Sequence, residues 1–278
     1  MKTFADVRMS EREARKVGVP HERGTLAGYT RILRLPLDDP LLARICEMRQ
    51  KYYRRGRSFA SADLEYEYTE KELRAASLLR VSFNCLYHDD GSEYGTQYDE
   101  GSVCQHCGAG RTQLSPLALD YSKMGRGQFQ KTLGGDFIVS STVTQQLQTN
   151  LFTGCRLESV LNSSGDIPRA PYFQVVPIEA PVEVIAPTVF GIDYCLQGEP
   201  NKYKCPLGHT AGLNLISEAY ISSTSWAGRP DIVFSRQRIG VRRGVCFPEP
   251  LLMVTPRVWF AIKKQIGRCA SVTVVHVE

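Results

Sequence analysis

Two short pairs of metal-binding residues lie far apart in the sequence and limit how this chain can fold. The first is Cys104-Gln-His-Cys107, followed by a glycine, and the second is Cys205-Pro-Leu-Gly-His209. Two intervening residues let a tight turn aim two thiolates at one point, and a structural zinc ion is held by four such donors. Each turn supplies only two donors, so the two turns must meet in space. The sequence therefore predicts one structural zinc ion with the ligands Cys104, Cys107, Cys205 and His209.

The same pattern leaves alternatives open. Cys195 or His106 could replace one of the four ligands. A pair of unliganded or redox-active thiols at the first turn is a further alternative. A complete set of four donors leaves no open coordination position, whereas catalytic zinc keeps one open. We therefore expect the ion to be structural rather than catalytic.

The other cysteines indicate free thiols. The chain has nine cysteines, an odd number, and most of them stand singly in apolar segments: Cys46, Cys85, Cys155, Cys246 and Cys269. Disulfide frameworks favour even counts in small secreted chains. We therefore expect buried thiols that pack as small hydrophobic side chains.

The sequence lacks the signals of a membrane or secreted protein. No apolar run approaches the roughly eighteen residues that a bilayer-spanning helix needs. The first residues, MKTFADVRMSEREARK, lack the apolar core of a secretory signal. With 42% hydrophobic and 23% charged residues, the composition is that of a globular protein. We therefore expect a cytoplasmic protein without a membrane partner.

Local patterns predict several elements. Asp39-Pro40 is a capping residue followed by a proline at the first helical position, so a helix should begin there. Thr69 with Glu72 predicts a second helix start through a reciprocal capping pair. Residues 64–68 alternate as a half-buried strand does. The runs 172–176 and 182–185 are flanked by prolines, which predicts edge or irregular strands.

An internal similarity suggests the organisation of the chain. Residues 137–151 align without gaps to residues 252–266, so that Val139 matches Val254, and each copy is typical of a strand, a helix and a second strand. The predicted fold is α+β, with two pseudo-repeated strand–helix–strand halves (about 137–160 and 252–275) joined by a zinc-ribbon-like site. Residues 1–84 form an α/β N-terminal extension, and residues 85–278 form a double zinc-knuckle domain.

The region 85–278 resembles the bacterial double-CXXCG motif proteins, which are common in myxobacteria. The resemblance rests on CQHCGAG, FIVSSTVTQQL, CPLGHTAGLNLISEAY, WAGRPDIVFSRQR and PEPLLMVTPRVW. It implies metal-ligand roles for Cys104, Cys107 and Cys205. The second motif reads CPLGH where CXXCG is expected, so His209 follows from the need for a fourth donor. Some members are described as immunity proteins, which implies a protein partner rather than a substrate.

Motifs of common enzymes are absent from the sequence, including the P-loop, G-x-S-x-G and H-E-x-x-H. His21, His88 and His276 are isolated. We therefore expect a protein without enzymatic activity.

An acidic loop suggests how a partner is bound. Tyrosines alternate with carboxylates in Tyr87, Asp89, Asp90, Glu93, Tyr94, Tyr98, Asp99 and Glu100. Tyrosine supplies contact area, and carboxylates steer a basic partner toward the surface. The spacing does not fit a calcium-binding loop. Together with the resemblance, the loop predicts an immunity protein that neutralises a cognate toxin by direct binding.

A nucleic-acid-binding protein is the alternative. The net charge is +5, and the arginines Arg236, Arg238, Arg242 and Arg243, together with the basic segment 51–57, could contact phosphates. Zinc knuckles also recur in nucleic-acid-binding proteins.

Overall fold

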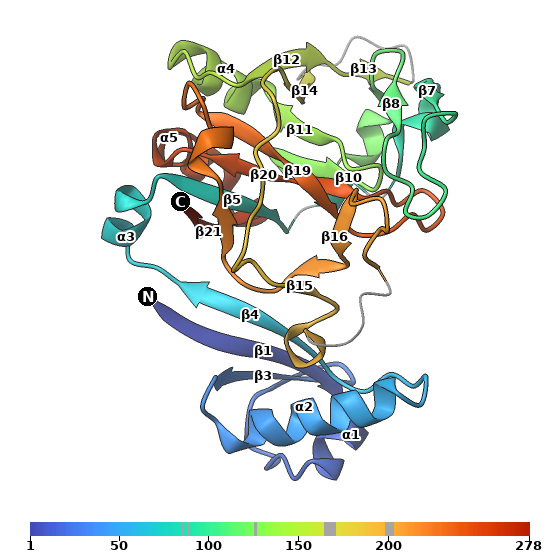
Figure 1. Cartoon of the computed structure of the whole chain (residues 1–278), viewed down its shortest axis with the longest axis vertical. Coiled ribbons are helices and arrows are strands. Elements are labelled where there is room, and N and C mark those ends of the chain that lie inside the picture. The colour runs from blue at the N-terminus through green and yellow to red at the C-terminus, as the bar shows by residue number, and fades with distance from the viewer. Residues whose placement is uncertain (85, 88, 125–126, 164–170, 198–202) are drawn as a thin grey trace.

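The computed structural model describes residues 1–84, 86–87, 89–124, 127–163, 171–197 and 203–278. It is a mixed α+β fold made mostly of strands, with five α-helices in the described residues, and the predicted class is confirmed at this level. Figure 1 shows a small N-terminal module at one end of the long axis and a larger body at the other. None of the described helices is long and apolar enough to span a membrane.

The N-terminal module is an antiparallel sheet covered by two helices. Its strands lie in the order β2-β3-β1-β4, which is the split β-α-β arrangement of ferredoxin-like folds. The elements are β1 (Lys2–Ser10), α1 (Glu11–Lys16), β2 (Thr25–Ala27), β3 (Thr30–Pro36), α2 (Pro40–Tyr53) and β4 (Ser61–Glu67). The predicted helix start is confirmed, because the Asp39 side chain accepts a hydrogen bond from Leu41 N. The predicted strand at 64–68 lies largely within β4.

Alternation along the strands builds the core of this module. Val7 and Met9 in β1 are buried together with Leu33 and Leu35 in β3, on the face that α2 covers with Ile45. The opposite positions of both strands are more exposed. One apolar face against an amphipathic helix is the usual way in which such a sheet becomes stable.

The body contains a six-stranded sheet in the order β16-β19-β20-β5-β21-β18. Its strands are β5 (Leu78–Phe83), β16 (Thr210–Gly212), β18 (Ala219–Ile221), β19 (Ile232–Ile239), β20 (Glu249–Val254) and β21 (Ala270–Val277). α3 (Glu70–Ala75) precedes β5 and begins at Thr69 with the predicted capping pair to Glu72. β5 falls within the range expected for the N-terminal extension, yet it pairs with β20 and β21 in the middle of this sheet.

A second, five-stranded sheet has the order β12-β14-β11-β10-β6. Its strands are β6 (Leu86–Tyr87), β10 (Phe129–Thr132), β11 (Phe137–Ser140), β12 (Cys155–Ser159) and β14 (Tyr172–Pro177). The expectation of an edge strand at 172–176 is wrong, because β14 pairs on both sides. Its prolines stand at its two ends, where they leave the ladder intact. The run 182–185 is irregular as expected, with isolated bridges at Val182 and Val184.

One buried cluster joins the two sheets to the two long helices of the body. α4 (Ser141–Thr149) follows β11, and α5 (Pro256–Ile266) follows β20. Val143 and Leu147 of α4 lie in the same cluster as Val258 and Ile262 of α5. Three two-stranded sheets complete the body: β7 (Tyr98–Asp99) with β8 (Thr112–Gln113), β9 (Ala118–Leu119) with β13 (Leu161–Asn162), and β15 (Phe190–Gly191) with β17 (Asn214–Leu215).

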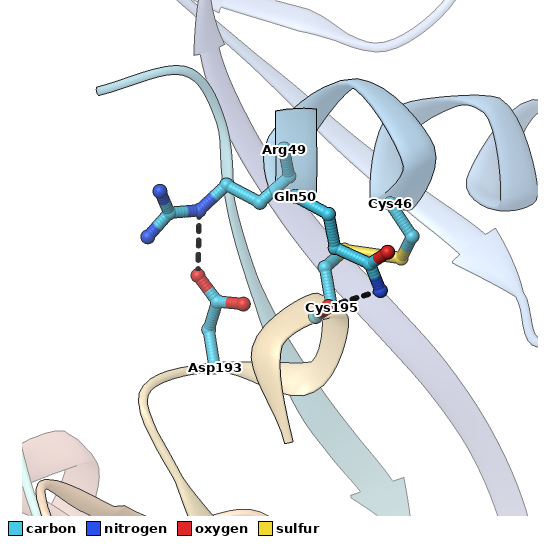
Figure 2. The surroundings of a disulfide bond; sticks show 5 residues. All are labelled: Cys46, Arg49, Gln50, Asp193 and Cys195. Atoms are coloured by element: carbon cyan, nitrogen blue, oxygen red, sulfur yellow. Dashed lines mark hydrogen bonds and ion pairs between the residues drawn. A yellow bond between two sulfur atoms is a disulfide. The ribbon is translucent and has the colours of Figure 1, made fainter. Parts of the chain in front are cut away.

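A disulfide bond ties the N-terminal module to the body. The expectation of free thiols is wrong for Cys46, and Cys195 is not a spare metal ligand, because the two residues are bonded to each other. Figure 2 shows the bond between α2 and a short turn, flanked by two polar contacts. Arg49 Nε lies 2.9 Å from Asp193 Oδ2, and Gln50 Nε2 donates to the Cys195 carbonyl at 3.1 Å.

The remaining single cysteines fit the expectation in part. Cys155, Cys246 and Cys269 are free and half-buried. Cys85 and His88 lie outside the described residues.

Candidate metal centre

The four residues predicted to share a metal ion lie together. One ligand atom from each of Cys104, Cys107, Cys205 and His209 lies within 4.8 Å of all the others. Cys205 Sγ is 3.8 Å from Cys104 Sγ and 3.7 Å from His209 Nδ1. Zinc–sulfur bonds of about 2.3 Å in a tetrahedron place neighbouring sulfurs about 3.8 Å apart. The spacing of these atoms therefore fits one tetrahedral ion.

The first turn, Cys104 to Cys107, is held at the end of the β7–β8 hairpin. Gly108 N donates to the Cys104 carbonyl at 2.8 Å, and Cys104 N donates to the Ala109 carbonyl at 2.7 Å. Gly108 has φ of +81°, a conformation that side chains other than glycine rarely adopt. The glycine after the second cysteine is therefore required by the turn itself, as its place in the motif predicts.

The second turn, Cys205 to His209, leads directly into β16. Gly208 N donates to the Cys205 carbonyl at 3.0 Å, and Cys205 N donates to the Thr210 carbonyl at 3.1 Å. These bonds form a tight loop that brings the thiol and the imidazole to the same side. The histidine ring is exposed, while the Cys205 thiol is buried.

Backbone contacts from β19 and the residues after it join the two turns. Arg238 N donates to the His209 carbonyl at 3.1 Å, and Arg242 N donates to the Cys107 carbonyl at 2.9 Å. The protein backbone therefore already holds the donor pairs against each other. A metal ion would add the remaining link between them.

The thiols have different surroundings. Although burial opposes it, hydrogen bonds from the backbone N–H groups of His106 and Cys107 lower the pKa of Cys104 to about 6. Burial raises the pKa of the Cys107 thiol to about 11. Metal ligation deprotonates a coordinating thiol, so a bound cation would change both values. In its absence, Cys104 is the more readily ionised of the two.

The donor set is the kind that zinc prefers. Three thiolates and one imidazole are soft or borderline ligands, and in a tetrahedron they favour zinc over calcium or magnesium, which take oxygen donors. His106 is exposed and lies outside the cluster, so among the described residues the predicted four are the ones brought together. A zinc ion bound by these four residues would rigidly link two turns that are far apart in the sequence.

The acidic loop does not form the surface expected from its sequence. Tyr87 is buried at 2% exposure, and Asp90 is fully buried. Arg111 donates to both carboxylate oxygens of Asp90, at 2.6 and 3.0 Å. Burial alone would raise the pKa of Asp90, but the hydrogen bonds from Arg111 and Ser92 lower it. The loop is therefore partly a structural support, and Tyr87 and Asp90 lie in the interior rather than on the predicted binding surface.

Part of the loop stays accessible. Glu93 and Glu100 are exposed, and Asp99 is half-buried. Glu100 lies 3.0 Å from Arg242 Nη1, beside the first turn.

The predicted basic face is divided between distant parts of the molecule. The segment 51–57 lies at the end of α2, at the far end of the long axis from β7 and β8 (Figure 1). Arg242 pairs with Glu100, and Arg243 Nη2 donates to the Tyr203 hydroxyl at 3.2 Å. Arg238 donates to the Pro248 carbonyl at 3.2 Å, and Arg236 is exposed.

A cleft of about 580 Å³ opens beside the first metal turn, and the sequence did not point to it. Its walls include Gly108 and Ala109 of the turn, Gln113 of β8, and Glu158 of β12. Behind them lies Asp136, whose pKa is raised by burial. The one feature of the sequence that relates to this cleft is the alternation of the charged residues Arg156 and Glu158 in a predicted strand. Alternation marks a solvent-facing side without showing that the side is concave.

No family model, no curated protein and no solved structure matches this chain.

Proposed function

We propose that this chain is a zinc-stabilised, non-enzymatic binding protein that neutralises a bacterial toxin by direct contact. The observation that carries the proposal is the closed Cys₃His set, whose four donors lie within 4.8 Å of one another. A metal ion in such a set has no position left for a substrate or a reactive water. Its contribution would be stability, and the function would then reside in a surface that the metal helps to shape.

The region beside the first metal turn is the proposed binding surface. The cleft of about 580 Å³ combines apolar and polar walls, as partner-binding sites do. Glu93 and Asp99 lie on the same acidic loop, which leads into this turn. Carboxylates at the rim of a binding surface raise the association rate with a cationic partner. The resemblance to double-CXXCG proteins supports a toxin as that partner.

We also propose that the two strand–helix–strand units arose by duplication. β11, α4 and β12 repeat the arrangement of β20, α5 and β21, and in each case one antiparallel strand separates the two strands of the unit. That strand is β14 in the first unit and β5 in the second. The aligned residues Val139 and Val254 are buried in the same cluster. The metal centre would then join the two halves, as a zinc-ribbon-like site does.

Co-expression with the product of a neighbouring toxin gene tests the proposed function. Cells should survive toxin expression only when this chain is present, and the two proteins should co-purify. The double variant Glu93→Lys, Asp99→Lys should weaken binding by about tenfold or more, mainly through slower association. Glu47→Lys reverses a charge on exposed α2, at the other end of the molecule, and should bind as the wild type does.

Two results would contradict the proposal. One is full toxicity in cells that contain folded, metal-loaded protein. The other is tight, salt-dependent binding of generic DNA or RNA with no protein partner, which would favour the nucleic-acid alternative.

A further inference from the structure

A polar patch interrupts one face of the six-stranded sheet. Arg80 pairs in register with Thr273, and Ser82 pairs with Ser271, between strands β5 and β21. Alternate residues of a strand share a face, so these four side chains lie on the same side as Leu78. Leu78 belongs to an apolar cluster on that side, whereas Leu79 lies in the core on the other side. The face therefore changes along β5 from apolar to polar, with an arginine at the boundary.

Arg80 has no counter-ion. Within the described residues its side chain forms no ion pair and no hydrogen bond, and the Thr273 hydroxyl beside it is buried without a partner. Glu249 acts on Arg80 only at a distance and is itself held by Lys131 at 2.6 Å. Partial burial lowers the pKa of the Arg80 guanidinium. Arg80 is half-buried, and its side-chain nitrogens are not among the buried atoms without a hydrogen-bond partner, so the guanidinium faces the solvent of the cleft that it lines.

The patch forms one wall of a cleft between the N-terminal module and the body. The cleft measures about 400 Å³, and its opposite wall is β4, including Tyr66. Figure 1 shows β4 as the edge strand of the N-terminal sheet, on the side that faces the body. Further polar side chains line it: Ser82, Asn84, Asn214, Ser217 and Ser271. A cleft of this size accommodates a small molecule rather than a protein segment.

The acidic residues of the cleft do not neutralise Arg80. Glu65 lies 3.1 Å from Arg34 and is paired there. Asp63 also lines the cleft, and burial together with the nearby Asp193 raises its pKa. Neither carboxylate is within ion-pair distance of Arg80 among the described contacts. The positive charge is therefore concentrated at the end of the cleft formed by β5 and β21.

We propose that this cleft binds the oxyanion of a small molecule, a carboxylate or a phosphate, with Arg80 as the charge partner. A guanidinium presents several N–H donors in one plane, which matches both kinds of oxyanion. The hydroxyls of Ser82, Ser271 and Thr273 can donate to the remaining oxygens. The ligand would supply a counter-ion for Arg80, whose side chain forms no ion pair within the described residues.

The location implies a consequence for the whole molecule. The two walls of the cleft belong to different parts of the protein, β4 to the module and β5 with β21 to the body. A ligand that contacts both walls stabilises their association in proportion to its occupancy. Binding should therefore be visible as increased thermal stability of the intact chain.

Thermal unfolding of the full-length, metal-loaded protein tests the proposal. The chain is measured in an oxyanion-free buffer and then with increasing inorganic phosphate or malonate, with sodium chloride keeping the ionic strength constant. We expect the unfolding midpoint to rise saturably with at least one of the two anions. A response to phosphate alone assigns a phosphate ligand, and a response to malonate alone assigns a carboxylate.

Two variants at the site make the experiment decisive. Arg80→Met should abolish the response, and in oxyanion-free buffer it should unfold near the wild-type midpoint, because it removes a half-buried guanidinium that forms no ion pair with the described residues. Thr273→Val should fold normally and bind the anion about tenfold more weakly in isothermal titration. Arg236→Met removes an exposed arginine outside the cleft and should respond as the wild type does.

The proposal is overturned if neither anion raises the wild-type midpoint beyond the effect of sodium chloride. It is also overturned if Arg80→Met responds to the anion as strongly as the wild type. If Thr273→Val binds the anion as tightly as the wild type, the anion does not bind at the proposed site. This test does not depend on whether the arginine variant folds.

Discussion

Gly108 packs so closely against Arg242 that a β-carbon on Gly108 would stand 2.3 Å from the β-carbon of Arg242. Arg242 also donates its backbone N–H to the Cys107 carbonyl, so the contact joins the first metal turn to the chain that follows β19. A side chain at position 108 would push these two segments apart. The glycine after the second cysteine thus serves both the turn and the packing behind it.

Gly108→Ala should therefore destabilise the protein and loosen the metal. The left-handed conformation costs a residue with a side chain about 1–2 kcal/mol, and the clash adds about 1–3 kcal/mol. Gly208→Ala is the matched control, because Gly208 has φ of +80° but nothing lies within 4 Å of its added β-carbon. Thermal unfolding and competition with a chelator measure both effects. If the two variants lose the same amount of stability, the contact between Gly108 and Arg242 does not contribute to it.

Each chain should carry one zinc ion. Elemental analysis of protein purified without added metal should give a ratio near one, and Cys205→Ser should lose the metal and become insoluble. Structural zinc contributes on the order of 10 kcal/mol in small domains, so strong chelators should unfold the region around the two turns. Cys269→Ser removes a free thiol outside the cluster and should keep the metal. Full solubility of a metal-free Cys104→Ser, Cys205→Ser double variant would refute a structural ion.

Asp90→Asn should destabilise the protein by about 3 kcal/mol, because it removes the close counter-ion of the buried Arg111 guanidinium and leaves only Glu100, 3.3 Å from Arg111 Nε. Glu70→Gln breaks solvent-exposed pairs with Arg74 and Lys263 and should change the free energy of unfolding far less. Chemical denaturation measures both. A loss at Asp90 as small as that at Glu70 would show that the pair is not a structural support.

The pH dependence of this pair has a defined sign. The pKa of Asp90 is lowered in the folded protein, so its stabilising contribution is fully present above the unfolded pKa of about 3.9. It is lost as the pH falls through the folded value. The difference in unfolding free energy between the wild type and Asp90→Asn should therefore shrink below about pH 4. A difference that grows on acidification would contradict the shift.

The protein should be less stable with the disulfide reduced than with it formed. Cys46 and Cys195 are separated by 149 residues, and closing so long a loop stabilises a folded chain by about 4–5 kcal/mol in the entropic account. Non-reducing mass spectrometry should recover the linked peptides. The double variant Cys46→Ser, Cys195→Ser should unfold like the reduced wild type and be insensitive to reductant. If reductant lowers the unfolding midpoint of the double variant as much as that of the wild type, the effect of the reductant does not come from this disulfide.

The features that sequence predicted correctly depend on residues that are close in the chain. Asp39 with Pro40 and Thr69 with Glu72 are capping signals within one turn of a helix, and both helices begin where these residues stand. The four residues of the Cys/His cluster were predicted for the same reason, because each turn carries its own spacing. That two turns must meet followed only from the number of donors that zinc requires.

The features that sequence missed depend on distant partners. Nothing near Cys46 indicates that Cys195 is its partner, and a count of nine cysteines argued against any pairing. Asp90 is typical of a solvated loop until Arg111, beyond the metal turn, is known to cover it. β5 lies within residues 1–84, the range predicted as an N-terminal extension, and no local pattern shows that its partners β20 and β21 lie near the other end of the sequence.

The pairing of β5 with β21 sets the order in which this molecule can be completed during its synthesis. Leu79 and Val81 leave the ribosome long before β20 and β21 are translated, so β5 lacks both of its neighbours in the sheet until β20 emerges, and it lacks β21 until residues 270–277 are made. An emerging chain must therefore shield an open strand edge for most of its translation. Molecular chaperones should accordingly be found on nascent chains of this protein that have passed β5 but have not yet reached β21.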